Sequence, residues 1–360
     1  MKHIISLIFA LSIAQVACAQ WHIDPCIQIN GLGYYLYDDT HEAMVADGNT
    51  WEGVLEIPST VTYDGKDYTV TTLAMTAFSY CETLTGVVIP ETVRGIERLI
   101  PNQQYPFLAC TNLEFIKVKE GNQWLCSDDS VLYSKDKKTL YSYPVGHKRT
   151  TYIIPDGVEY ISAGAFAYNT SLTSVVIPNS VHEIYMMAFQ GCDGLKEVTL
   201  PNNLTVLHDY SFQLCNNLET IKFPEKLIEI KTQAFLGCPS LRVVDLPESF
   251  RKVEGLCFWK SSIDTLVIRG ILECDPSRII DGIQNSPIVY VPQSEIDKYK
   301  AIYSGTVLPL TSSHPNSIQN LQMTKQSPSP ATLYDLSGRR LSAPPAKGLF
   351  IQKGKKVVTQ

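Results

Sequence analysis

Seven histidines and ten cysteines are the side chains of this 360-residue chain best suited to metal binding or nucleophilic catalysis. The histidines are scattered without the spacing of metal ligands, at His3, His22, His41, His147, His182, His208 and His314. The segment 127–130, Ser-Asp-Asp-Ser, resembles a calcium loop only weakly, because it lacks the glycine and the distal glutamate of an EF-hand, and a turn is expected there. No nucleophile elbow, phosphate-binding loop, zinc-protease or dinucleotide-binding motif is present. The sequence therefore predicts no catalytic residue, no metal site and no cofactor.

Five of the cysteines occupy one position of a repeat, at Cys81, Cys110, Cys192, Cys215 and Cys238. Asn169 and Ser261 fill the same position in other copies, so this position needs a small side chain and no covalent bond. Neighbouring strands lie about 4.8 Å apart, which a disulfide could bridge. Three consecutive cysteines cannot all pair among themselves, however, and we expect buried, reduced thiols. The pairing of Cys26, Cys126, Cys257 and Cys274 stays open.

The repeat itself has a fixed length. Its strongest mark is an apolar residue followed by proline, which recurs every 23 residues at Ile154-Pro155, Ile177-Pro178, Leu200-Pro201, Phe223-Pro224 and Leu246-Pro247. Alternating β-branched residues before each proline predict a short strand, and proline ends it because it lacks a backbone donor. A period in the twenties is typical of a solenoid. One copy is too small to fold alone, so we expect stacked coils with a parallel strand ladder, a continuous core and capped ends.

The full pattern, L-x-x-V-x-I-P-x-x-V-x-x-I-x-x-x-A-F-x-x-C, resembles the BspA-like, or Treponema pallidum-type, leucine-rich repeat of bacterial surface proteins. The resemblance covers about residues 51–270, although the Asn of the generic leucine-rich repeat is missing. It implies a β-rich solenoid, a right-handed leucine-rich-repeat superhelix with strands inside and short helical or extended turns outside. It also implies adhesion, since relatives act as adhesins toward host matrix proteins and other bacteria.

Two segments interrupt the repeats. An Asp-Gly pair within 63–68 predicts a hairpin. Strand-like runs at 130–134 and 139–144 around the Lys-Asp-Lys-Lys turn predict a second hairpin within 122–148, which we expect to project from the edge of the coil.

The domain organisation follows from these patterns. We expect a signal peptide over 1–19 cleaved after Ala19, with a lipoprotein acylated at Cys18 as the alternative. An N-terminal cap at 20–50, the solenoid at 51–270 and a C-terminal cap at 271–310 follow. A linker at 311–330 leads to a tail at 331–360 that is similar to type IX secretion sorting signals of Bacteroidetes, the alternative being a small hairpin that ends the chain.

Composition narrows the range of partners. The formal charge of −6 gives no basic excess, which argues against nucleic acid and anionic membrane. No segment after the signal peptide is long and apolar enough to span a bilayer. We therefore expect a secreted or cell-surface protein.

The candidate binding surface consists of strand side chains that point away from the core, two or four residues before each proline position. They are Val88, Phe115, Lys117, Ile153, Val176, Thr199, Lys222, Val243, Asp245 and Val267. Several are apolar, which often marks a protein contact, although the β-propensity of Val and Ile offers an alternative explanation. Phe115 and Tyr133 are the predicted energetic hot spots.

The leading functional hypothesis is an exported, non-enzymatic protein that binds a host or bacterial surface protein or glycan through the concave strand face. The alternative is a structural envelope module that scaffolds another subunit through its outer turns or caps. A third hypothesis is an enzyme with an unfamiliar site near residues 122–148.

Overall fold

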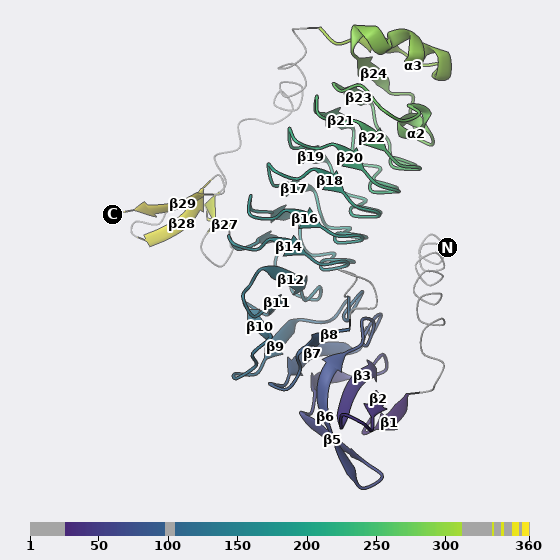
Figure 1. Ribbon diagram of the computed structural model, residues 1–360. Coiled ribbons are helices and arrows are strands. Elements are labelled where there is room, and N and C mark those ends of the chain that lie inside the picture. Colours follow the sequence, from purple (N-terminus) through teal and green to yellow (C-terminus); the bar gives the residue numbers. More distant parts are fainter. Residues whose placement is uncertain are drawn as a thin grey trace.

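The computed structural model describes residues 26–97 and 105–311, together with four strands of the C-terminal tail. The predicted signal peptide, and all of the predicted linker except its first residue, lie outside the described residues. The described coils stack into one elongated array, with the N-terminal sheet at one end and helix α3 (Ile296–Ile302) at the other (Figure 1). The expectation of a β-rich leucine-rich-repeat solenoid is confirmed.

The strands before the proline positions pair in parallel from coil to coil within three separate sheets. The middle sheet contains β13 (Thr151–Ile153), β15 (Ser174–Val176), β17 (Glu197–Thr199) and β19 (Thr220–Lys222). The first sheet contains β4 (Gly53–Glu56), β7 (Leu84–Ile89) and β9 (Phe115–Val118), and the last contains β21 (Val243–Leu246), β23 (Thr265–Ile268), β24 (Ile288–Val291) and β25 (Val307–Pro309). Ile153, Val176, Thr199 and Lys222 stand in register, as the 23-residue period predicts.

A second parallel ladder runs along the other side of each coil. It consists of two-residue strands in two sheets, with β14 (Tyr160–Ile161) and β16 (Glu183–Ile184) in one and β18 (Val206–Leu207), β20 (Glu229–Ile230) and β22 (Lys252–Val253) in the other. The expected outer segments were short helical or extended turns. The extended form is the one found, since the helices in the described part of the chain, apart from tight turns, come after the repeats.

A column of phenylalanines fills the centre of the core. The rings of Phe166, Phe189, Phe212, Phe235 and Phe258 stack face to face, with centroids 4.8, 5.2, 5.4 and 5.4 Å apart. All five side chains are fully buried. Because each ring contacts the rings of the coils above and below, each interior coil depends on its neighbours for its core.

The side chain at the repeated cysteine position is small and also makes a hydrogen bond. The Cys192 thiol donates a hydrogen bond to the Phe166 carbonyl of the preceding coil, at 3.2 Å. Ser261 makes the same bond to Phe235 at 2.7 Å, and the Asn169 amide donates to Val145 at 3.1 Å. The nine described cysteines are free, and the five of the repeat position are buried, as expected. The position therefore selects a small hydrogen-bond donor.

A mixed sheet covers the N-terminal end of the coils. Its strands are β1 (Ile27–Ile29), β2 (Leu32–Tyr37), β3 (Glu42–Asp47), β5 (Thr60–Tyr63), β6 (Lys66–Leu73) and β8 (Gly95–Ile96). Strands β5 and β6 form the hairpin predicted within 63–68, and both turn residues, Asp64 and Gly65, have positive φ. That prediction is confirmed.

The insert within 122–148 forms three strands, β10 (Leu125–Asp128), β11 (Val131–Ser134) and β12 (Thr139–Ser142). The predicted hairpin is present as β11 and β12, but the expectation that it projects from the coil is wrong. Strand β12 pairs in parallel with β14 of the next coil. Alternate side chains enter two different hydrophobic clusters, Leu132 on one side and Val131 and Tyr133 on the other. The insert is therefore an internal partition between two blocks of coils.

The C-terminal end of the repeats continues the last sheet into β24 and β25. Helices α2 (Ser277–Ile280) and α3 and a 3-10 turn, η1 (Gln293–Glu295), accompany these strands. Tyr299 of α3 is buried against the main core, as expected for a helix that closes the stack. None of the helices in the described regions has the length and apolarity that crossing a bilayer requires.

The tail forms a small antiparallel sheet of β26 (Leu333–Tyr334), β27 (Arg340–Leu341), β28 (Gly348–Gln352) and β29 (Lys355–Thr359).

Candidate binding surface

The strand face comprises the outward side chains of β4, β7, β9, β13, β15, β17, β19, β21 and β23. Among the predicted site residues, Lys117, Thr199 and Lys222 are exposed. The half-buried ones are Val88, Phe115, Ile153, Val176, Val243 and Asp245. Their β-ladder register is as predicted, but they fall into three separate sheets. The structure therefore divides them into three groups, which are Val88, Phe115 and Lys117 on the first sheet, Ile153, Val176, Thr199 and Lys222 on the middle sheet, and Val243 and Asp245 on the last sheet.

Val267 does not belong to the exposed surface. Its side chain is 0% exposed, so the expectation that it faces solvent is wrong. It stands in register between Asp245 and Tyr290, whose longer side chains flank it on both sides, and an Arg269 side chain bridges to Asp245 at 2.8 Å.

Tyr133 cannot serve as a surface hot spot, so that prediction is also wrong. Its side chain is 1% exposed, and its hydroxyl lies 2.6 Å from the Tyr152 hydroxyl. Burial raises the pKa of Tyr133 well above its ordinary value. The alternation of the hairpin explains the error, because the partition buries both faces of its strands.

Phe115 forms a distinct apolar feature on the first sheet. Its ring lies over Gly86 of the neighbouring strand, where a β-carbon would come within 2.3 Å of the ring. Val54, the next residue in this register, is 54% exposed. We call Val54, Gly86 and Phe115 the apolar shelf. A glycine within a strand is the sequence signal for such a close approach, and our sequence-based site omitted both Gly86 and Val54.

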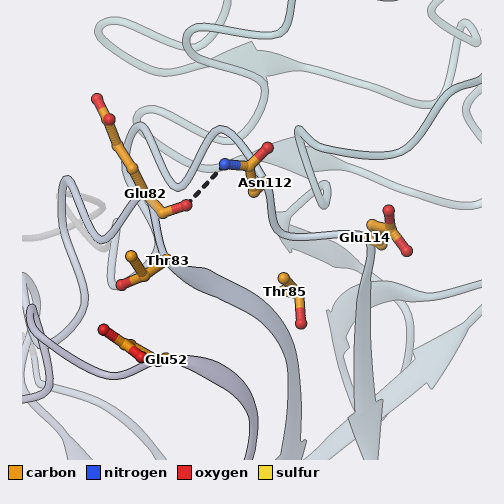
Figure 2. Close-up of a pocket in the computed structure, with 6 residues that line it drawn as sticks. All are labelled: Glu52, Glu82, Thr83, Thr85, Asn112 and Glu114. Carbon is orange, nitrogen blue, oxygen red and sulfur yellow. Dashed lines mark hydrogen bonds between the residues drawn. The ribbon is translucent and has the colours of Figure 1, made fainter.

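A hollow of about 500 Å³ opens beside the apolar shelf at the beginning of the same strands (Figure 2). The acidic hollow is lined by Glu52, Glu82, Thr83, Thr85, Asn112 and Glu114. Figure 2 shows the side chains of Glu52, Glu82 and Glu114 pointing in different directions at the edges of this shallow hollow, with the Asn112 amide donating to the Glu82 backbone carbonyl at 2.7 Å. None of the lining residues carries a positive charge. The hollow therefore suits a cationic group better than an anionic one.

Other coils pair the charges at the corresponding position. Glu114 follows a buried leucine, and the equivalent residues of later coils include Lys196, Glu219, Arg242 and Asp264. Lys196 lies 3.8 Å from Glu219, and Arg242 lies 3.7 Å from Asp264. Glu52, Glu82 and Glu114 form no ion pair within the described part of the chain. The carboxylates of the acidic hollow thus lack the ion-pair partners that the later coils provide, and Glu114 lies close enough to His147 to act on its charge.

The opposite face of the coils carries both aromatic and charged side chains. His208 lies 3.2 Å from Glu183 and packs against Tyr185, while His182 is exposed. Further along, Lys252 contacts Glu229 at 2.6 Å. The described residues hold no group of three or more His, Cys, Asp or Glu placed to bind a metal ion.

The weak calcium-loop resemblance at 127–130 is explained by a turn. Asp128 pairs with Lys137 at 2.6 Å, and Asp129 forms an ion pair with Arg149. Asp129 and Ser130 have positive φ in the tight turn between β10 and β11, which confirms the turn interpretation.

Comparison with solved structures finds leucine-rich-repeat proteins. One from Bacteroides ovatus has 20% identity and a TM-score of 0.47, covering 79% of this chain and 76% of its own. The pneumococcal vaccine antigen PcpA has 16% identity and a TM-score of 0.44, with 79% and 98% coverage. The T. pallidum leucine-rich repeat protein has 26% identity and a TM-score of 0.37, with 60% and 90% coverage.

Curated proteins give no match to the chain. The family model for the BspA type leucine rich repeat region matches six copies, over residues 61–123 and 143–265. These segments make up more than half of the 360 residues, and the matched copies lie on either side of the partition. The chain therefore belongs to the BspA-type leucine-rich repeat family.

Proposed function

We propose that this protein is exported to the cell surface and binds a protein or glycan ligand through its strand face, without catalysing a reaction. The observation that carries the proposal is the register of Ile153, Val176, Thr199 and Lys222, which places apolar and polar side chains in one outward column. Such a column offers area and complementarity to a macromolecule. The proposal includes removal of residues 1–19 and a sorting role for the tail.

If a ligand binds over the whole outward column, a few side chains near its centre should contribute most of the binding energy. The test is capture of immobilised host matrix proteins and mucin glycans by the purified protein. Val176→Glu and Lys222→Glu should each weaken capture, since one places a charge in the apolar part of the column and the other reverses a charge. Val206→Glu on β18 is the matched control, because it changes the opposite face of the coil.

Unchanged capture by both strand-face variants, with loss in the Val206→Glu variant, would refute the strand-face proposal and favour the second candidate function. That candidate is a structural module that contacts another subunit through its outer turns. It rests on the partly buried Tyr80, Tyr168, Tyr185 and Tyr210, which pack on a separate small cluster at the turns. Tyr185→Glu would then abolish association, whereas Val176→Glu would not.

A hydrolase screen of the purified protein tests the remaining alternative of an enzyme with a site near residues 122–148. Because the partition buries Val131, Leu132 and Tyr133, a catalytic site there would have to lie on its exposed rim.

A further inference from the structure

We infer that the first sheet of the strand face, β4–β7–β9, is a docking surface for an extended protein segment that carries lysine or arginine next to an apolar residue. This inference rests on the proposed binding function and narrows its partner from protein or glycan to a basic protein segment. Three observations support it: an exposed apolar shelf, an adjoining hollow and carboxylates that lack ion-pair partners among the described residues.

The apolar shelf supplies the contact area. Val54 is 54% exposed, although strand positions that face solvent are normally polar. Gly86 lacks a side chain, and the Phe115 ring occupies the space that a side chain there would fill. An aromatic ring held in this way can pack against the aliphatic stem of a lysine or arginine, and its face attracts the cation.

The acidic hollow supplies the charge complementarity. Glu52, Glu82 and Glu114 line it, and Thr83 and Thr85 add hydroxyl groups that can accept hydrogen bonds (Figure 2). Lys117 stands at the other end of the same sheet, on β9. Glu56 of β4 stands in the same row as Lys117 and pairs with Lys119 at 2.5 Å, so the unpaired negative charge of this sheet lies at the acidic hollow, and that is where the cationic side chain of a partner should lie.

The rest of the solenoid provides an internal comparison. Where the equivalent positions of later coils carry a carboxylate, a basic residue of the preceding coil lies beside it, as in Lys196–Glu219 and Arg242–Asp264. In the first sheet the residue before Glu114 in this ladder is Thr85, which is uncharged. A partner that carries a cation would provide the charge that Thr85 does not.

The same chemistry argues against other macromolecules at this surface. Phosphates and sulfated or sialylated glycans are anionic and would be repelled by three carboxylates. A neutral glycan would gain nothing from them. The electrostatic contribution should weaken as ionic strength rises, because exposed charges are screened over about 8 Å at physiological salt.

The experiment measures the affinity of the purified protein for a short fluorescein-labelled peptide in which lysine and valine alternate. Its two comparison probes are the same peptide with every lysine acetylated and the same peptide with glutamate in place of lysine. We expect the lysine peptide to bind and both comparison peptides to bind at least about tenfold more weakly.

Two triple variants locate the site. Glu52→Gln, Glu82→Gln and Glu114→Gln together should weaken binding of the lysine peptide about tenfold. The control combines Asp156→Asn, Glu225→Gln and Glu248→Gln, which are exposed, lie after the strands and lower the negative charge of the protein equally. Phe115→Ala should weaken binding without removing the preference for lysine over glutamate.

Three results would overturn the inference: no binding of the lysine peptide, equal binding of its acetylated form, or equal loss in both triple variants. None of these results bears on the proposed function, which is tested separately by the capture of matrix proteins and mucin glycans by the Val176→Glu, Lys222→Glu and Val206→Glu proteins.

Discussion

The Cys215 thiol lies one coil beyond Phe189 and donates a hydrogen bond to its backbone carbonyl, at 3.2 Å. Both side chains are fully buried, and the same relationship joins Cys192 to Phe166 and Cys238 to Phe212. The cysteines thus connect the coils through hydrogen bonds and not through disulfides.

Substitutions of Cys215 should separate donor loss from volume loss. Cys215→Ser keeps a donor, as Ser261 does in its own coil, and should change the free energy of unfolding by less than about 1 kcal/mol. Cys215→Ala leaves a small cavity and removes one of the two donors to the Phe189 carbonyl, the other being the Cys192 backbone N–H at 3.3 Å, and should cost about 1–3 kcal/mol. Urea denaturation measures both. Equal losses for the two variants would contradict the hydrogen-bond role.

The buried thiols also predict how stability depends on pH. Burial raises the pKa of Cys192 and of Cys238 from 9.0 to about 12. Above pH 9 the unfolded chain loses these protons while the folded protein keeps them, so stability is complete below pH 9 and decreases as pH rises toward 12. Each thiol should cost about 1 kcal/mol between pH 8 and pH 10. Urea denaturation at pH 8 and at pH 10 measures this decrease in the free energy of unfolding. The decrease should be smaller in the Cys192→Ser protein, and an equal decrease there would show that the Cys192 thiol is not its source.

The hydroxyls of Tyr133 and Tyr152 should be coupled energetically. Tyr133→Phe leaves the buried Tyr152 hydroxyl without its partner and should cost about 1–3 kcal/mol of unfolding free energy. The double variant with Tyr152→Phe should cost less than the sum of the single changes, by about 1 kcal/mol. Strictly additive changes would show that the two hydroxyls do not interact. Ligand capture by the Tyr133→Phe protein should be normal, because the side chain is buried.

Gly191 should resist substitution. Its φ is +65°, and a β-carbon there would lie 2.8 Å from the Tyr168 ring. Tyr168, Leu214 and Lys260 adopt similar φ at the same place in their own coils, so a side chain is tolerated there at a cost. Gly191→Ala should lower the free energy of unfolding by about 1–2 kcal/mol.

The matched control for Gly191 is Gly255→Ala, where a β-carbon meets no atom within 4 Å. Its stability should be unchanged or raised by up to about 1 kcal/mol. Thermal unfolding compares the two variants, and an equal loss at Gly255 would argue against backbone strain at Gly191.

The sequence predicted those features that depend on repetition. The prolines after Ile154 and Ile177 fixed the phase, so the register of the outward column from Ile153 to Lys222 could be predicted residue by residue. A fixed period carries this information because equivalent residues of stacked coils must lie above one another.

Features that depend on local surroundings could not be predicted in this way. The two-residue strands of the second ladder, such as Glu183–Ile184, are too short to give a periodic signal. Alternation in 130–134 predicted strands, but it could not show that both faces of Tyr133 and its neighbours would be covered. The acidic hollow depends on which charges lack a partner one coil away, and that is visible only once Glu114 and Thr85 are placed side by side.

The phenylalanine column has a consequence for how the length of this protein can change. Within the column each ring stacks on the rings directly above and below, so removing residues 195–217 would delete one full turn of the spiral and set Phe235 where Phe212 had been, on Phe189. The molecule can thus be shortened or extended in whole steps, while a deletion of any other size would put every later side chain out of alignment.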